Sequence, residues 1–369
     1  MVRYFQARRL LLVSLVIAAV ALTGCGGDSG GGGTGGGGAT SGAGKDSGTV
    51  AFLLPENVTA RWEQQDRPGF IDAMQKYAPG VKVQVSNALN DPAKQQAQAE
   101  AALAAGAKVL VLIPVDAEAA AVIVKKAEQQ KVPVIAYDRL VRNSALAYYV
   151  SVDGRTIGEL QGKWLADKTK QGDNLAVING SPTDDNARLF NEGYMSVLDP
   201  LFASGERNKV YEASTPGWEP PKAQREMEQA LTKTDNDIDG VLSANDGMAG
   251  GIIAALDAQK LAGKVPVTGL DATTEALQLI LRGKQGMSVW RSLREQSDKA
   301  AQLVAALISG KQAPAGLVTG SVNNGQMDVP WATVTPQVID ATNIQLVIDD
   351  GAATKEQVCA GIPAGTGPC

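Results

Sequence analysis

The chain has 369 residues, 44% of them hydrophobic and 20% charged, which is enough for two globular domains. Its net charge of −5 argues against a nucleic-acid partner, which would favour a basic surface. The chain contains no histidine, which excludes Ser-His-Asp and Cys-His catalysis and the usual zinc sites, and we expect neither a metal nor a cofactor. An enzyme that uses carboxylates or lysine remains possible.

Residues 1–25 are typical of an export signal. Arginines at positions 3, 8 and 9 precede the apolar run LLLVSLVIAAVAL, and small residues follow it. A transmembrane anchor is the alternative, but the apolar run is short for one. Residues 22–25, LTGC, resemble the lipobox of bacterial lipoproteins, so we expect Cys25 to carry a lipid, with simple secretion as the alternative.

Residues 26–48 are dominated by glycine and serine and cannot build a core, so we expect a flexible tether. A lipid on a long tether predicts an extracytoplasmic domain that works just outside the membrane. Two further cysteines, Cys359 and Cys369, lie near the C-terminal end of the chain. Because export permits disulfides, we expect them to form one, with two free thiols as the alternative.

The sequence from residue 49 alternates between apolar strands and amphipathic helices. Strands are predicted at 50–55, 81–88, 109–116 and 132–138, with helices at 61–78, 91–107 and 117–130 between them. Asp91 and Pro92 begin the second of these helices. Such alternation predicts βαβ units and a parallel sheet with helices on both faces.

The same alternation restarts after a strand at 148–154. Helices are expected at 156–170, 185–202, 220–233, 247–261 and 295–310. Strands are expected at 174–182, 208–214, 239–246, 265–272 and 286–292. Residues 323–343 are rich in turn formers and are predicted to be a crossing segment. The fold class is therefore α/β, with two doubly wound parallel-sheet lobes.

Polar side chains follow the predicted strands at their carboxyl ends. Asp138 and Arg139 follow the strand at 132–138, and the others come after later strands: Asn186, Asn245, Asp271 and Arg291. Each could simply cap a helix, which is a common role for such residues. Because ligands of open parallel sheets bind outside the carboxyl ends of the strands, the set together predicts a polar binding cleft.

Two tryptophans lie in predicted loops at the same end of the strands. Trp62 directly follows Arg61, and Trp218 lies in a loop of proline and glycine. Both could fill the core, but flat indole faces also match the C–H faces of a pyranose ring. Asp, Asn and Arg side chains supply the donors and acceptors that sugar hydroxyls need. The sequence thus favours a monosaccharide ligand.

At these residues the chain resembles a known family. The segments TARWEQQDRPGF, AYDRLV, NGSPTDDNARLF, PGWEPPKA, SANDGMAGG, VTGLDA and NNGQMDVP resemble periplasmic sugar-binding proteins of ABC transporters, type I fold, closest to the D-xylose-binding branch. The resemblance runs from about residue 49 to about 350. It implies a three-segment hinge, with crossings near 151–154, 271–274 and 324–330. The N-terminal lobe would be 49–152 plus 272–324, the C-terminal lobe 153–271 plus 325–350, and 351–369 a tail.

The resemblance also implies a role for each site residue. Trp62 and Trp218 would sandwich the sugar, and its hydrogen bonds would come from Arg61, Asp138, Arg139, Asn186, Asn245 and Asp271, the last of these at a hinge. Arg291 stands where lysine is more usual, and Leu270 stands where GQDA is the commoner form. D-xylose is the expected ligand, and glucose, arabinose and galactose remain candidates.

The implied partners are a membrane permease and a lipid anchor, with the protein itself a monomer. A sensor that presents sugar to a membrane receptor would share the binding chemistry. A glycoside hydrolase using Asp138 and Asp271 is the enzymatic alternative, because such enzymes need two carboxyl groups about 5–10 Å apart. A transcription regulator of similar fold is disfavoured, because the signal and tether occupy the place of its DNA-binding helices.

Overall fold

The computed structural model describes residues 47–369, which belong to one compact unit. The predicted signal segment, Cys25 and the tether up to residue 46 lie outside the described residues. Within residues 47–369, no helix has the length and apolar character needed to cross a membrane.

A seven-stranded sheet forms the centre of the first lobe. Its strand order is β10-β11-β5-β4-β3-β1-β2, and every neighbouring pair is parallel except β10 with β11. The strands are β1 (Gly48–Leu54), β2 (Val81–Asn87), β3 (Val109–Leu112), β4 (Val134–Tyr137), β5 (Tyr148–Val152), β10 (Gly320–Asn323) and β11 (Asp328–Val334).

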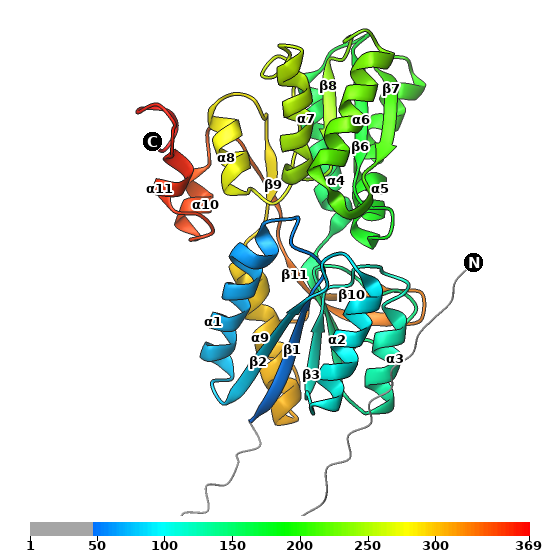
Figure 1. The fold of residues 1–369 in the computed structure, drawn as a ribbon, viewed down its shortest axis with the longest axis vertical. Helices are drawn as coiled ribbons and strands as arrows, with labels where there is room; N and C mark the ends of the chain where they lie inside the picture. The colour runs from blue at the N-terminus through cyan, green and yellow to red at the C-terminus, as the bar shows by residue number, and fades with distance from the viewer. Residues whose placement is uncertain (1–46) are drawn as a thin grey trace, which may run out of the picture. The chain divides into compact units, whose positions relative to one another are not determined.

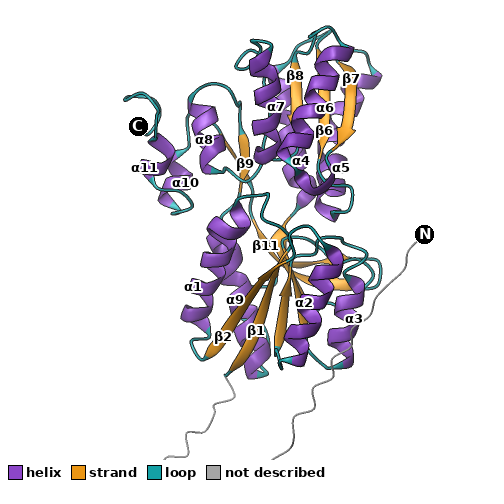
Figure 2. Cartoon of the chain, in the orientation of Figure 1, coloured by secondary structure: helices purple, strands orange, loops and turns teal. Residues whose placement is uncertain are grey.

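Helices cover both faces of this sheet, as Figures 1 and 2 show. Val50 and Phe52 of β1 pack toward α1 (Arg67–Tyr77) and α9 (Leu293–Ser309), whereas Ala51 and Leu53 pack toward α2 (Pro92–Ala104) and α3 (Ala121–Gln129). Alternate residues of a strand point to opposite faces, so a strand covered on both faces is apolar throughout. This is the reason that these strands appear in the sequence as unbroken apolar runs.

The second lobe is built around β6 (Asn174–Asn179), β7 (Asn208–Ser214) and β8 (Gly240–Ser243), in the order β7-β6-β8 with parallel pairing. Single bridges Val241–Val267 and Leu270–Val289 extend the pairing to β9 (Ser288–Trp290), which pairs with β12 (Gln337–Ile339). The helices are α4 (Gly154–Lys168), α5 (Asp185–Ala203), α6 (Pro220–Lys233), α7 (Asp246–Ala258) and α8 (Thr274–Leu281). The predicted α/β class with two parallel-sheet lobes is confirmed.

The structure corrects the predicted lobe boundaries. Leu270 and Val289 pack in the core of the second lobe, so the second crossing lies at 290–293, between β9 and α9, and not at 271–274. Asp271 is therefore not at a crossing, whereas Arg291 is. The segment predicted as a crossing at 324–330 instead contributes β11 to the first sheet, and the third crossing lies at 334–337. The first lobe is thus 47–152 plus 292–334, and the second lobe is 153–291 plus 335–369.

The C-terminal residues are packed and do not form a separate tail. They contain α10 (Gln345–Asp349) and α11 (Lys355–Cys359), and Val358 is fully buried in a cluster with Leu277 and Ile280 of α8. Cys359 and Cys369 are joined by a disulfide. Residues 351–369 therefore belong to the second lobe.

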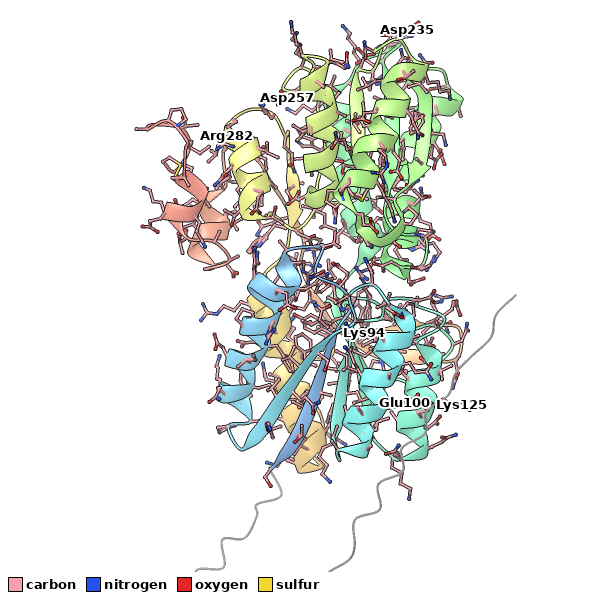
Figure 3. The ribbon with its side chains drawn as sticks, in the orientation of Figure 1. Lys94, Glu100, Lys125, Asp235, Asp257 and Arg282 are labelled. Carbon is pink, nitrogen blue, oxygen red and sulfur yellow. A yellow bond between two sulfur atoms is a disulfide. The ribbon has the colours of Figure 1, made fainter. Side chains whose placement is uncertain are left out.

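Charged side chains occupy the outward faces of the helices. Figure 3 labels six of them: Lys94, Glu100, Lys125, Asp235, Asp257 and Arg282. The charged side chains that remain buried are consequently informative, because ionised groups are rarely buried without partners. Many of them gather where the two lobes meet.

Candidate functional site

One pocket at the carboxyl ends of the strands is lined by residues of both lobes. The space in and around it that protein atoms do not fill, open solvent included, is about 310 Å³. The residues that line the pocket include all nine singled out in the sequence: Arg61, Trp62, Asp138, Arg139, Asn186, Trp218, Asn245, Asp271 and Arg291. The other four lining residues are Thr59, Asp184, Phe190 and Leu270.

Three of these residues adopt backbone conformations that are unusual for their type. The φ angles of Asp138, Trp218 and Asp271 are 63°, 59° and 100°. Residues other than glycine seldom adopt positive φ, and such strained positions cluster at functional sites. At Asp138 and Asp271 the strained backbone turns each carboxylate from a strand end into the pocket.

Arg61 is oriented by a partner that the sequence did not reveal. A short π-helix, η1 (Trp62–Asp66), follows it, and Asp66 accepts two hydrogen bonds from its guanidinium, from Nε at 2.7 Å and from Nη2 at 2.8 Å. In an α-helix, residues five apart are turned about 140° from each other, so no helical pattern would pair Arg61 with Asp66. The wider π-turn brings them to the same face.

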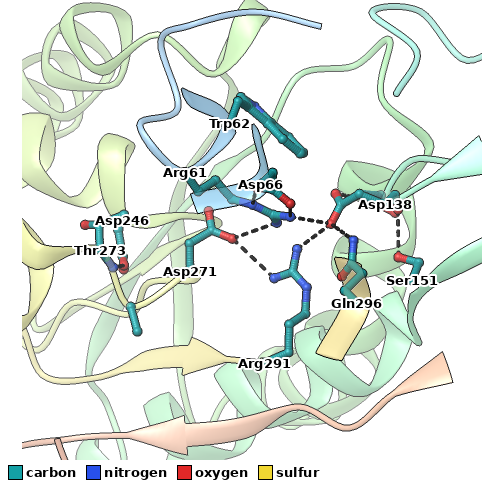
Figure 4. A network of polar contacts seen from close by, with 12 residues as sticks. Arg61, Trp62, Asp66, Asp138, Ser151, Asp246, Asp271, Thr273, Arg291 and Gln296 are labelled. Atoms are coloured by element: carbon teal, nitrogen blue, oxygen red, sulfur yellow. Dashed lines mark hydrogen bonds and ion pairs between the residues drawn. The ribbon is translucent and has the colours of Figure 1, made fainter. Parts of the chain in front are cut away.

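Two arginines and two aspartates form a closed network in the pocket (Figure 4). Arg61 lies 3.0 Å from Asp138 Oδ2 and 3.3 Å from Asp271 Oδ1. Arg291 lies 2.6 Å from the same oxygen of Asp138 and 3.2 Å from the same oxygen of Asp271. Since Arg61 and Asp138 come from the first lobe, Asp271 from the second and Arg291 from a crossing, the network joins every part of the site.

The charges of this network support one another. Burial raises the pKa of Asp138, but Arg61 and Arg291 outweigh that effect and hold the pKa well below its usual range. Burial lowers the pKa of Arg61, yet Asp138, Asp66 and Asp271 together raise it well above its usual value. Asp138 and Arg61 are therefore both ionised at neutral pH, and they present fixed acceptors and donors to a polar ligand.

The two asparagines contribute in different ways. Asn186, on the second lobe, donates from Nδ2 to the carbonyl oxygen of Asp138 at 3.2 Å and so crosses between the lobes. Asn245 accepts the backbone N–H of Met248 at 2.9 Å and caps α7. The helix-cap alternative is therefore correct for Asn245, although the same residue also lines the pocket.

Both tryptophans are almost fully buried and still reach the pocket. Only 2% of Trp62 and 4% of Trp218 is exposed, and each belongs to the apolar core of its own lobe. The Arg61 guanidinium carbon lies 4.3 Å from the centroid of the Trp62 ring, which is a cation–π distance. Gly180 leaves room for Trp218, because a Cβ there would lie 2.0 Å from its ring. The core-filling and pocket-lining interpretations are thus both correct.

Five buried acidic residues received no ligand role in the sequence analysis: Glu56, Asp66, Asp184, Asp185 and Asp246. Glu56 accepts a hydrogen bond from the indole N–H of Trp62, and Asp184 accepts one from that of Trp218. Asp184 lies within the quoted segment NGSPTDDNARLF, so a signal for it was present. No local pattern marks Glu56 as an indole acceptor. Across residues 47–369, no group of acidic, cysteine or histidine side chains is arranged to hold a metal ion.

Asp246 predicts a pH effect on stability. Burial, followed by the charge of Asp271, raises the pKa of Asp246 from 3.8 to about 8. Between about pH 4 and pH 8 the folded protein retains a proton that the unfolded chain releases. The free energy of unfolding therefore falls as pH rises, by up to about 1.4 kcal/mol per pH unit. In thermal unfolding at pH 5 and pH 8, Asp246→Asn should lose less stability than the wild type between the two values.

The matched control for this measurement is Asp235→Asn, which changes an exposed aspartate and should follow the wild type at both pH values. If Asp246→Asn and the wild type lose the same stability between pH 5 and pH 8, Asp246 does not retain its proton.

Comparison with known proteins gives the family. Residues 50–312 match the model of the periplasmic binding protein domain. This chain belongs to the periplasmic binding protein family. The sequence resemblance implied this family and the type I fold, and both are confirmed.

The relatives include two D-xylose-binding periplasmic proteins. That of Haemophilus influenzae is 39% identical over 299 residues, which cover 81% of this chain and 88% of the relative. That of Escherichia coli is 38% identical over 292 residues, covering 79% and 86%. A solute-binding protein of an ABC transporter from Clostridium phytofermentans, solved with β-D-glucose bound, has a TM-score of 0.77 and 31% identity, covering 84% of this chain and 99% of that one.

Proposed function

We propose that this protein binds a monosaccharide, D-xylose in the first instance, between its two lobes and delivers it to the permease of an ABC transporter. The observation that carries the proposal is the pocket itself, in which two indoles, three arginines and several acid and amide side chains from both lobes converge. Support also comes from the relatives, two of which are named for binding D-xylose.

The chemistry of the pocket suits a pyranose ring. Apolar indole faces match the C–H faces of the sugar, while ionised carboxylates accept hydrogen bonds from its hydroxyls and guanidinium groups donate to them. Asp138 and Asp271 each contact both Arg61 and Arg291, so their oxygens are held in fixed positions. A sugar hydroxyl can therefore bind an aspartate and an arginine at the same time.

Binding is coupled to closure of the lobes. Some contacts already join the lobes without involving the pocket: the N–H of Ala117 donates to Thr183 at 3.0 Å, and Asn90 Nδ2 donates to the carbonyl oxygen of Gly217 at 3.2 Å. A bound sugar would contact both lobes, through Asp138 and Trp62 on one and Asn186 and Trp218 on the other. It makes both sets of contacts only when the lobes are together. It therefore shifts the population toward the closed form, which is the form offered to the permease.

Titration calorimetry of the full-length protein with D-xylose, D-glucose, L-arabinose and D-galactose tests the proposal. We expect D-xylose to bind most tightly and Trp218→Ala to weaken that binding at least about tenfold, because one face of the sandwich is lost. Trp164→Ala, which removes an indole from α4 outside the pocket, is the matched control and should bind as the wild type does. Absence of heat with all four sugars would contradict the proposal.

A second candidate is a binding protein for several aldoses. It is favoured by a multiple sugar-binding periplasmic receptor of Rhizobium radiobacter, which is 32% identical over 326 residues covering 84% of this chain and 91% of the relative. The arginine at position 291 and the leucine at 270 both line the pocket and depart from the D-xylose-binding pattern. Similar affinities for D-xylose and D-glucose in the same titrations would favour this candidate.

Binding without turnover fits the electrostatics better than glycoside hydrolysis. A glycosidase that used Asp138 as its acid would need that carboxyl group to stay protonated near neutral pH. The pKa of Asp138 is instead held well below its usual range by Arg61 and Arg291. We further propose that a lipid on Cys25 anchors the protein, as a monomer, outside the cell membrane.

A further inference from the structure

Each tryptophan of the pocket is fixed through its indole nitrogen by a buried carboxylate of its own lobe. In the first lobe, Trp62 Nε1 donates to Glu56 Oε1, and the other oxygen of Glu56 accepts the backbone N–H groups of Val58 and Thr59. Glu56 is fully buried. Both of its oxygens are therefore engaged within the turn that precedes the π-helix.

The second lobe repeats this construction. Trp218 Nε1 donates to Asp184 Oδ2 at 3.1 Å, and Asp184 Oδ1 accepts the backbone N–H of Asn186 at 3.0 Å, which caps α5. Only 4% of Asp184 is exposed. In both lobes, then, one oxygen of a buried acid accepts backbone N–H groups while the other holds an indole; in the second lobe those backbone contacts cap α5, and in the first they lie in the turn before η1.

Arg139 lies between the two acids. Its Nε is 2.7 Å from Asp184 Oδ2, and its Nη2 is 3.7 Å from Glu56 Oε1. These are the same oxygens that accept the two indole N–H groups. Its guanidinium carbon also lies 5.3 Å from the centroid of the Trp62 ring. A continuous chain of polar contacts thus connects the two rings across the lobes, in the order Trp62, Glu56, Arg139, Asp184, Trp218.

We propose that Glu56 and Asp184 are positioning residues that set the spacing and tilt of the two indole planes through Arg139, and thereby determine which pyranose the closed pocket accepts. This inference rests on the proposed function. The oxygens of both acids are occupied by protein donors, so their effect on the sugar is exerted through the rings. Rigid rings exclude a sugar whose substituents project from the ring plane, whereas loosely held rings admit it.

Two isosteric variants test the proposal, Glu56→Gln and Asp184→Asn, because each places an amide NH₂ where an oxygen accepted hydrogen bonds. Titration calorimetry should show D-xylose binding weakened about tenfold in each variant. D-glucose and D-galactose should lose less, so that the preference for D-xylose decreases. Matched controls are Asp257→Asn, whose carboxylate pairs with Lys284 within the second lobe, and Glu63→Gln, whose carboxylate pairs with Arg67. Both controls should keep the wild-type preference.

A spectroscopic measurement distinguishes a coupled bridge from two separate supports. In protein labelled with 5-fluorotryptophan, the ¹⁹F resonances of Trp62 and Trp218 are assigned by replacing each with phenylalanine. In the presence of saturating D-xylose, Asp184→Asn should shift the Trp62 resonance, although the two residues lie on different lobes. Asp257→Asn should leave that resonance in place. Glu56→Gln should shift the Trp218 resonance in the same way.

Should either isosteric variant fail to fold, Trp62→Phe and Trp218→Phe remove the indole N–H together with the five-membered ring but keep an aromatic face, and they must then reproduce the loss of sugar preference. Unchanged preference in all these variants, or ¹⁹F shifts confined to the lobe of the substitution, would overturn the inference while the proposed function stands. If the wild-type protein binds none of the sugars, the proposed function and the inference both fail.

Discussion

Replacing Asp138 by asparagine is expected to weaken D-xylose binding about a hundredfold, because the change removes one of the two carboxylates that pair with both Arg61 and Arg291. Breaking a buried ion pair by neutralising one partner destabilises by about 3–5 kcal/mol, since the other charge stays buried. Asparagine is the right test because it tolerates the positive φ of 63° at this position, whereas alanine would add backbone strain. Titration calorimetry measures the effect.

The matched control is Asp235→Asn, an exposed aspartate that also has a positive φ, of 51°. It should bind D-xylose with wild-type affinity. An Asp138→Asn variant that bound within twofold of the wild type would mean that the network of Figure 4 does not contact the sugar.

Replacing Gly158 by alanine is expected to destabilise the second lobe by about 3 kcal/mol or more. Gly158 of α4 faces α5, and a Cβ there would lie 2.1 Å from the carbonyl oxygen of Phe190. Gly193 faces it from α5, where a Cβ would lie 2.2 Å from the carbonyl oxygen of Arg155. Backbone atoms of two packed helices cannot move aside as a flexible side chain does, so the helices must separate.

The matched control is Gly250→Ala in α7, where a Cβ meets nothing within 4 Å. Because alanine is the better helix former by about 1 kcal/mol, this variant should be as stable as the wild type or more stable. Urea unfolding of the wild type, Gly158→Ala and Gly250→Ala measures the free energy of unfolding of each protein. Sugar affinity should also fall in Gly158→Ala, because α5 begins at Asp185 and carries Asn186 into the pocket. Equal stability of the two glycine variants would show that the close crossing of α4 and α5 is not required.

The local elements could be predicted because their signals are local. The strands β2, β3 and β4 lie within the predicted runs, and β1 overlaps its run but begins two residues earlier. β3 and β4 are buried throughout, which makes their runs apolar. Asp91 caps α2 as expected, with its carboxylate accepting the N–H groups of Ala93 and Lys94. The predicted strand at 265–272 forms only isolated bridges, because its pairing depends on neighbours that its own residues do not specify.

The site residues could be predicted for a related reason. Parallel strands end at one edge of a sheet, so polar residues that follow different strands of one lobe gather at that edge, as Asn245 and Asp271 do in the second lobe. Their supports could not be predicted in the same way. The hydrogen bond between Arg61 and Asp271 spans 210 positions in the chain, and the pairing of Arg61 with Asp66 needs a π-turn.

The sequence by itself determined the alternation of strands and helices, the parallel sheets and the set of polar and aromatic residues at the strand ends, because each follows from residue patterns within one element. Only the tertiary structure decided that β11 joins the first sheet, that α8 and β9 belong to the second lobe, and that Glu56, Asp66 and Asp184 hold the pocket's side chains in place. The physical reason is that burial and charge pairing act between residues close in space, whatever their separation along the chain.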